Sequence, residues 1–142
     1  MKRFEFIDHT ADLAVKVYGK TPEEVFESAV IAWLKSTLNT NPSSGKEKKK
    51  LRLKADSLEE LLVEFLAEIN FFLLVRHWVT TAVAQLHLTE KNGKWEINAI
   101  LNGEMFDFLK HRISAEIKAV TFHQMKIEKI QDPFQTTIIF DT

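Results

Sequence analysis

Two helix start signals, each followed by apolar residues at helical spacing, set the architecture of this 142-residue chain. Thr21 and Ser57 are each followed three residues later by glutamate, a combination that satisfies free N–H groups in the first turn of a helix. The first signal precedes an apolar face that continues to Leu38, and the second precedes a broader stripe that ends near residues 74–77. We therefore expect two helices, with the second at the centre of the core.

Outside these helices the apolar residues alternate with polar ones, as expected for strands. The alternating segments are 4–6, 13–18, 51–53 (a short edge strand), 80–89, 95–101, 114–128 (one bent strand or two) and 136–140. Asn92-Gly93 predicts a type I′ hairpin, because both residues accept a positive φ. Two helices and about seven clustered strands indicate an α+β protein. We expect a single domain over residues 1–142, in which two helices pack on a largely antiparallel (mixed) sheet.

Composition excludes several classes of function. The chain has 19 basic and 20 acidic residues, a balance unlike that of a general nucleic-acid binder. It has no Cys, which removes thiol catalysis and thiolate metal sites, and neither a phosphate-binding loop nor a G-x-S-x-G motif occurs. No segment reaches the roughly 20 apolar residues that span a bilayer, and the N-terminus is not a signal peptide. These features predict a soluble cytoplasmic protein without a membrane partner.

The run of lysines at positions 46 and 48–50 has two readings. Clustered basic residues can bind RNA, but Glu47 interrupts this run and no aromatic residues are interleaved with it. A solvated loop over residues 39–50 is therefore favoured over RNA binding.

Three polar segments are candidates for chemistry. The corner from Asp8 and His9 to Asp12 is either an oxygen-rich cation site or a turn stabilised by side-chain hydrogen bonds. Asp141 and Thr142 end the last strand, where adjacent carboxylates would be relieved by a cation or simply solvated. The remaining candidates, Glu116, Lys118 and His123, lie on one alternating segment. A Glu–Lys pair on a strand is commonly a cross-strand ion pair of little value, and a histidine on a mixed face is more often a hydrogen-bonded structural residue than a ligand.

Taken in order, these segments resemble the archease family. The matching motifs are DHTAD, GKTPEEVF, LLVEFLAEI, GEMFD…H, EIKAVTFH and FDT, which together span residues 8–142. The resemblance implies a non-catalytic accessory protein that activates an RtcB-type RNA ligase, which joins a 2′,3′-cyclic phosphate end to a 5′-hydroxyl end in tRNA splicing and RNA repair. The accessory protein promotes guanylylation of the ligase and multiple turnover, and it reaches tRNA through the ligase rather than by strong direct binding.

The resemblance also implies a divalent cation site. The family pattern assigns Asp12 and Asp141 as ligands, with an oxygen of Thr142, and favours Ca²⁺ with Mg²⁺ or Mn²⁺ as alternatives. Matching positions that surround the site or face the ligase are Asp8, His9, Glu116, Lys118 and His123.

Two other functions compete with this reading. One is a metal-dependent hydrolase or transferase with His9 as the base, although no nucleophile motif accompanies it. The other is a general chaperone or adaptor that uses a phenylalanine-rich surface, which would require a large exposed apolar patch.

Overall fold

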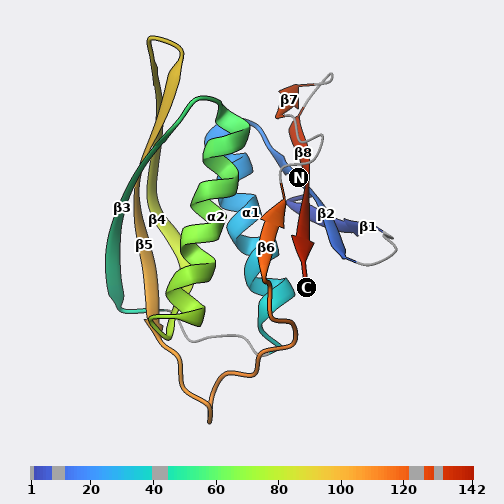
Figure 1. The fold of residues 1–142 in the computed structure, drawn as a ribbon, viewed down its shortest axis with the longest axis vertical. Helices are drawn as coiled ribbons and strands as arrows, with labels where there is room; N and C mark the ends of the chain where they lie inside the picture. Colours follow the sequence, from blue (N-terminus) through green and yellow to red (C-terminus); the bar gives the residue numbers. More distant parts are fainter. Residues whose placement is uncertain (1, 8–11, 40–44, 122–126, 130–132) are drawn as a thin grey trace.

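A computed structural model describes residues 2–7, 12–39, 45–121, 127–129 and 133–142. The described part contains two helices and eight strands (Figure 1). In chain order they are β1 (Phe4–Ile7), β2 (Leu13–Gly19), α1 (Pro22–Thr37), β3 (Glu47–Ala55), α2 (Leu58–Leu74), β4 (Trp78–Lys91), β5 (Lys94–Met105), β6 (Ala119–Thr121), β7 (Glu128–Lys129) and β8 (Phe134–Asp141). The predicted corner at residues 8–11 and His123 lie outside the described residues.

Both helices begin where the sequence predicts. The Thr21 hydroxyl accepts the Glu24 backbone N–H at 3.2 Å, and the Ser57 hydroxyl accepts the Glu60 backbone N–H at 3.1 Å. Each bond satisfies one of the N–H groups that the first turn leaves without a helical partner. No helix of the described chain is long and apolar enough to cross a membrane.

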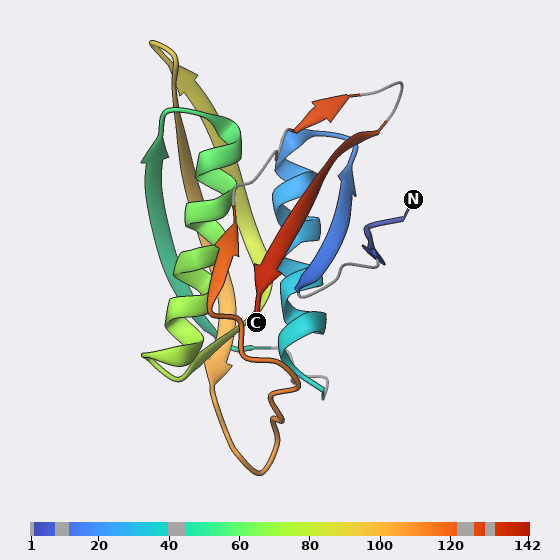
Figure 2. The same cartoon turned by 45° about the vertical axis from the view of Figure 1, so that its right-hand side comes forward.

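The strands form two sheets, and every described strand pair is antiparallel. The larger sheet has the order β1-β2-β8-β6 with β7 also paired to β8, and the smaller has the order β3-β5-β4. The two helices lie between the sheets (Figures 1 and 2). This middle position explains the broad apolar stripe of α2, whose buried residues include Leu61, Phe65 and Ile69. The α+β prediction is confirmed, with two antiparallel sheets in place of one.

The hairpin between β4 and β5 is also confirmed. Asn92 and Gly93 have φ values of 54° and 78°, as a type I′ turn requires. Further along β5, Gly103 lies against the Trp78 ring and the Val79 carbonyl, and a Cβ at this position would overlap both. A residue without a side chain is therefore needed where β5 passes Trp78.

Two predicted boundaries are wrong. Residues 47–50 belong to β3 rather than to a loop, because each pairs with β5 and the alternating lysines extend into solvent. In the described part of segment 114–128 the first strand begins at Ala119 rather than near Ser114, and a second strand begins at Glu128. Ile117 is fully buried, and its carbonyl bonds to a helix side chain instead of a neighbouring strand.

Candidate functional site

One end of the larger sheet brings together residues from the beginning and the end of the chain. On β2 and β8, Leu13 is paired with Phe140, so the next residues outward are Asp12 and Asp141 (Figure 2). On the other side of β8, Ala119 is paired with Asp141, and the Lys118 backbone N–H donates to the Asp141 carbonyl at 2.7 Å. Asp12, Asp141 and Lys118 therefore share this sheet end.

The Asp141 side chain lies on the face of β8 that is turned away from the helices. Ile138 and Phe140 are fully buried on the helix side of β8, whereas Asp141 follows on the alternate face and is exposed. Thr142 and Lys118 are also exposed, while Asp12 is half-buried. Neither aspartate forms an ion pair with another described residue. The aspartates and Lys118 are thus open to a solute or a partner.

The donor chemistry suits a hard cation, because carboxylate and main-chain oxygens are the ligands that Ca²⁺ and Mg²⁺ prefer. Within the described residues, no group of three or more His, Cys, Asp or Glu side chains gathers around one point. The predicted residues Asp8, His9 and His123 lie outside the described residues. Asp12 and Asp141 are therefore the side-chain donors that the described residues bring to this end, and Glu116 is an exposed neighbour two residues before Lys118.

A buried hydrogen-bond chain fixes the backbone just before Lys118, which leads into β6. The Trp33 indole N–H donates to Asn70 Oδ1 at 3.0 Å, and Asn70 Nδ2 donates to the Ile117 carbonyl at 2.6 Å. The chain links α1, α2 and the residue next to Lys118. Asn70 is thus a positioning residue that the sequence alone does not predict. The one feature of the sequence that marks Asn70 is that a polar residue interrupts the apolar stripe of α2.

A second buried residue, His111, holds the loop between β5 and β6 through two hydrogen bonds. His111 Nδ1 accepts the Asp107 backbone N–H at 2.9 Å, and its Nε2 lies 2.7 Å from Glu104 Oε2. Only 2% of His111 is exposed, whereas Phe108 and Leu109 on the same loop are 84% and 97% exposed. The loop protrudes beyond both sheets (Figures 1 and 2). An exposed apolar tip on an ordered loop is suited to contact with another protein.

Fold and site together define a small α+β protein with an acidic, solvent-facing sheet end and an apolar loop tip. The chain matches the archease protein family (MTH1598/TM1083) over residues 4–142. This protein belongs to the archease family.

Individual relatives agree with this assignment. A protein archease of Methanosarcina barkeri is 36% identical over 140 residues, covering 99% of this chain and 96% of the relative. A protein archease of Pyrococcus abyssi is 39% identical over 137 residues, covering 93% and 92%. The solution structure of Methanobacterium thermoautotrophicum protein 1598 matches all of both chains with a TM-score of 0.83 at 29% identity.

Proposed function

We propose that this chain is a non-catalytic accessory protein that activates an RtcB-type RNA ligase in the cytoplasm, in tRNA splicing and RNA repair. It promotes guanylylation of the ligase, so that each ligase molecule completes many rounds of joining. The observation that carries the proposal is the meeting of Asp12, Asp141 and Lys118 at one open sheet end in a member of the archease family.

In this proposal Asp12 and Asp141 hold a divalent cation, Ca²⁺ in the first instance, with a main-chain oxygen of Thr142. The bound cation supplies positive charge at the sheet end, where a phosphate or a ligase carboxylate can approach. Lys118 contributes a second positive charge beside it, which favours contact with an anionic group of the ligase or its nucleotide.

The exposed loop tip supports a protein partner. Phe108 and Leu109 present exposed apolar side chains on the loop that continues along the chain into Glu116 and Lys118. His111 holds the base of the loop and reduces the entropy lost when the tip binds.

The direct test measures ligase turnover with GTP, Mn²⁺ and excess RNA. Wild-type protein should raise the number of joined RNA molecules per ligase well above one, and Asp12→Ala and Asp141→Ala should abolish this effect. Lys118→Ala should weaken it. Asp56→Ala is the matched control, because the Asp56 side chain is 80% exposed and its lysine neighbour lies 3.9 Å away.

Circular dichroism establishes first that each variant folds. If wild-type protein gives no more turnovers than ligase alone, the proposal is wrong. Phosphoester hydrolysis by the isolated chain would support the hydrolase alternative instead, and protection of unrelated proteins from aggregation would support a general chaperone.

Cation binding is tested separately from activity. Calcium added at 100 times its dissociation constant should stabilise the wild-type protein by about 2.7 kcal/mol, seen as a raised melting temperature. Asp12→Asn and Asp141→Asn should remove this rise, and Asp56→Asn should keep it. An equal rise in all four proteins would place the cation elsewhere.

A further inference from the structure

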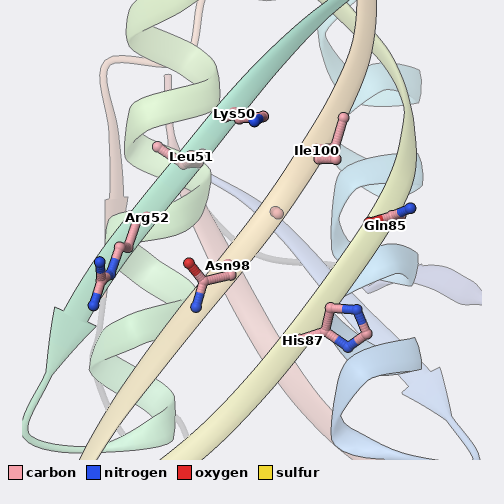
Figure 3. A pocket seen from close by; sticks show the side chains of 8 residues that line it. Lys50, Leu51, Arg52, Gln85, His87, Asn98 and Ile100 are labelled. Carbon is pink, nitrogen blue, oxygen red and sulfur yellow. The ribbon is translucent and has the colours of Figure 1, made fainter.

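The smaller sheet has one face without a helix on it. Figure 3 shows the outer face of β3, β5 and β4, with the helices behind the sheet. Alternation along β3 turns four consecutive outward positions to this face, and all are basic: Lys48, Lys50, Arg52 and Lys54. Residues two apart on a strand are about 6.7 Å apart, so the row is about 20 Å long.

Only part of this charge is neutralised within the described chain. Arg52 and Lys54 share one carboxylate, Glu96, with N–O distances of 3.1 and 3.5 Å. Lys48 donates to the neutral Asn102 amide at 2.7 Å, and Lys50 forms no ion pair with a described residue. The whole chain carries a net charge of −1, so the positive charge of this face reflects a local concentration of basic residues rather than an excess over the chain.

Polar groups continue across the sheet. A hollow of about 380 Å³ lies over the three strands, and Gln85, His87 and Asn98 line it together with Lys50 and Arg52 (Figure 3). A second hollow of about 500 Å³ lies beside it, and its lining includes Lys91 and Lys94 of the hairpin as well as Arg52. Basic side chains therefore extend from β3 to the end of the β4–β5 hairpin, where Glu96 also lines the second hollow and Lys94 lies 3.9 Å from Asp56.

Protection of the sheet edge explains some of these lysines. β3 is an edge strand, and exposed lysines discourage two edges from pairing. This explanation does not extend to Asn98 on the central strand or to the basic pair at the hairpin. Together these groups match a polyanion that lies across the sheet.

We propose that the outer face of the β3-β5-β4 sheet binds the phosphate backbone of double-helical RNA. No Phe, Tyr or Trp lines the 380 Å³ hollow, and Trp95 is the one aromatic residue lining the neighbouring hollow, so the two hollows offer no row of rings on which successive bases stack. Amide and imidazole groups beside the lysines suit the phosphates and 2′-hydroxyls displayed by an RNA helix. The choice of RNA rests on the proposed function, whereas the binding itself is a property of this chain alone.

Binding of this kind is sequence-independent and sensitive to salt. Four phosphate contacts predict that the logarithm of the association constant falls with the logarithm of salt concentration with a slope of roughly −3.6. Affinity is expected in the micromolar range at physiological salt, which is typical of non-specific contacts to phosphate.

The test measures fluorescence anisotropy of a labelled RNA hairpin titrated with the isolated full-length chain, without ligase. Lys48→Glu/Lys50→Glu should weaken binding at least tenfold and reduce the salt slope by roughly 2, because two phosphate contacts are lost. The matched control is Lys2→Glu/Lys20→Glu, which changes the net charge equally at residues outside β3, β4 and β5. This control should change affinity by less than about threefold, since distant exposed charges are largely screened.

Four outcomes overturn the proposal. The first is no RNA binding by the wild-type protein at 100 times the expected micromolar dissociation constant, and the second is an equal loss of RNA affinity in both double variants. The third is tighter binding to an unpaired strand than to the hairpin. The fourth is loss of ligase binding by the β3 variant while its RNA binding stays intact. The last outcome would make this face a protein interface. Failure of ligase activation with RNA binding retained would overturn the proposed function alone.

Discussion

Asn70 is the buried side chain on which the site depends most directly. Its amide accepts from the Trp33 indole and donates to the Ile117 carbonyl, and the residue is 6% exposed. Asn70→Leu keeps a similar volume and removes both bonds. It leaves an indole N–H and a carbonyl without these partners inside the protein.

The expected cost follows from those two groups. A buried polar group that loses its partner costs about 1–3 kcal/mol, so the pair costs roughly 2–6 kcal/mol. Added apolar contact from leucine offsets part of this, and we expect a net loss of about 3 kcal/mol in the free energy of unfolding. For a domain of this size the melting temperature should fall by about 10 °C.

Urea unfolding gives the free energy, and hydrogen exchange reports on the site. The Lys118 amide, which donates to Asp141, should exchange faster in Asn70→Leu because the neighbouring Ile117 carbonyl is no longer held. Thr37→Val is the matched control, since the Thr37 hydroxyl, among the described residues, bonds only to the Trp33 carbonyl one turn earlier in α1. It should stay within about 1 kcal/mol of wild type.

Two results would refute this account of Asn70. One is an unfolding free energy for Asn70→Leu within about 0.5 kcal/mol of wild type, which is the effect of an ordinary surface change. The other is a large destabilisation with exchange at Lys118 rising no more than at other core amides, which would make Asn70 a structural residue without a role in positioning the site.

Three further predictions concern other parts of the fold. Burial and a hydrogen bond to a glutamate raise the pKa of Tyr18, the only tyrosine, to about 12. A raised native pKa means that the folded protein favours the neutral phenol. The stabilisation from Tyr18 is therefore complete below pH 10 and is lost between pH 10 and 12. Tyrosinate absorbance measures the titration, and unfolding at alkaline pH measures the loss of stability. Gly103→Ala should lower the unfolding free energy by about 2 kcal/mol in urea, because its Cβ overlaps the Trp78 ring. His111→Ala removes two hydrogen bonds at the base of the loop and should cost about 2 kcal/mol, measured in the same way.

Each of these predictions has a simple contrary result. A native tyrosine midpoint near pH 10 would show that the phenol is not buried against the carboxylate. Wild-type stability of Gly103→Ala would mean that β5 shifts away from Trp78 at little cost. Unchanged stability of His111→Ala would show that the loop is held by its backbone hydrogen bonds alone.

Local elements were predictable because their signals lie within a few residues. Each helix start depends on a side chain beside the backbone N–H that it satisfies. The Asn92-Gly93 turn depends on two adjacent residues that accept a positive φ. The charges of residues 47–50 predict a loop. These residues form a strand because they pair with β5, some 50 residues later in the chain. The division into two sheets was equally hidden, because no local signal states which strands pair.

The residues of the candidate site also differ in how far the sequence predicts them. That Asp12 and Asp141 share one sheet end was implied by the family resemblance, and the pairing of β2 with β8 agrees with it. Spacing along the chain alone left the two aspartates unrelated. No local signal predicts the role of Asn70, because its partners Trp33 and Ile117 are 37 and 47 residues away.

The order of strands in the larger sheet also bears on how the protein matures. β8 leaves the ribosome after every other described strand, yet it lies between β2 and β6 and pairs with both. Until residues 134–141 dock, the two flanking strands have no common neighbour, and Asp12 has no Asp141 beside it. A chain synthesised only as far as β6 therefore lacks this sheet end, and the docking of β8 both joins β2 to β6 and places Asp141 beside Asp12.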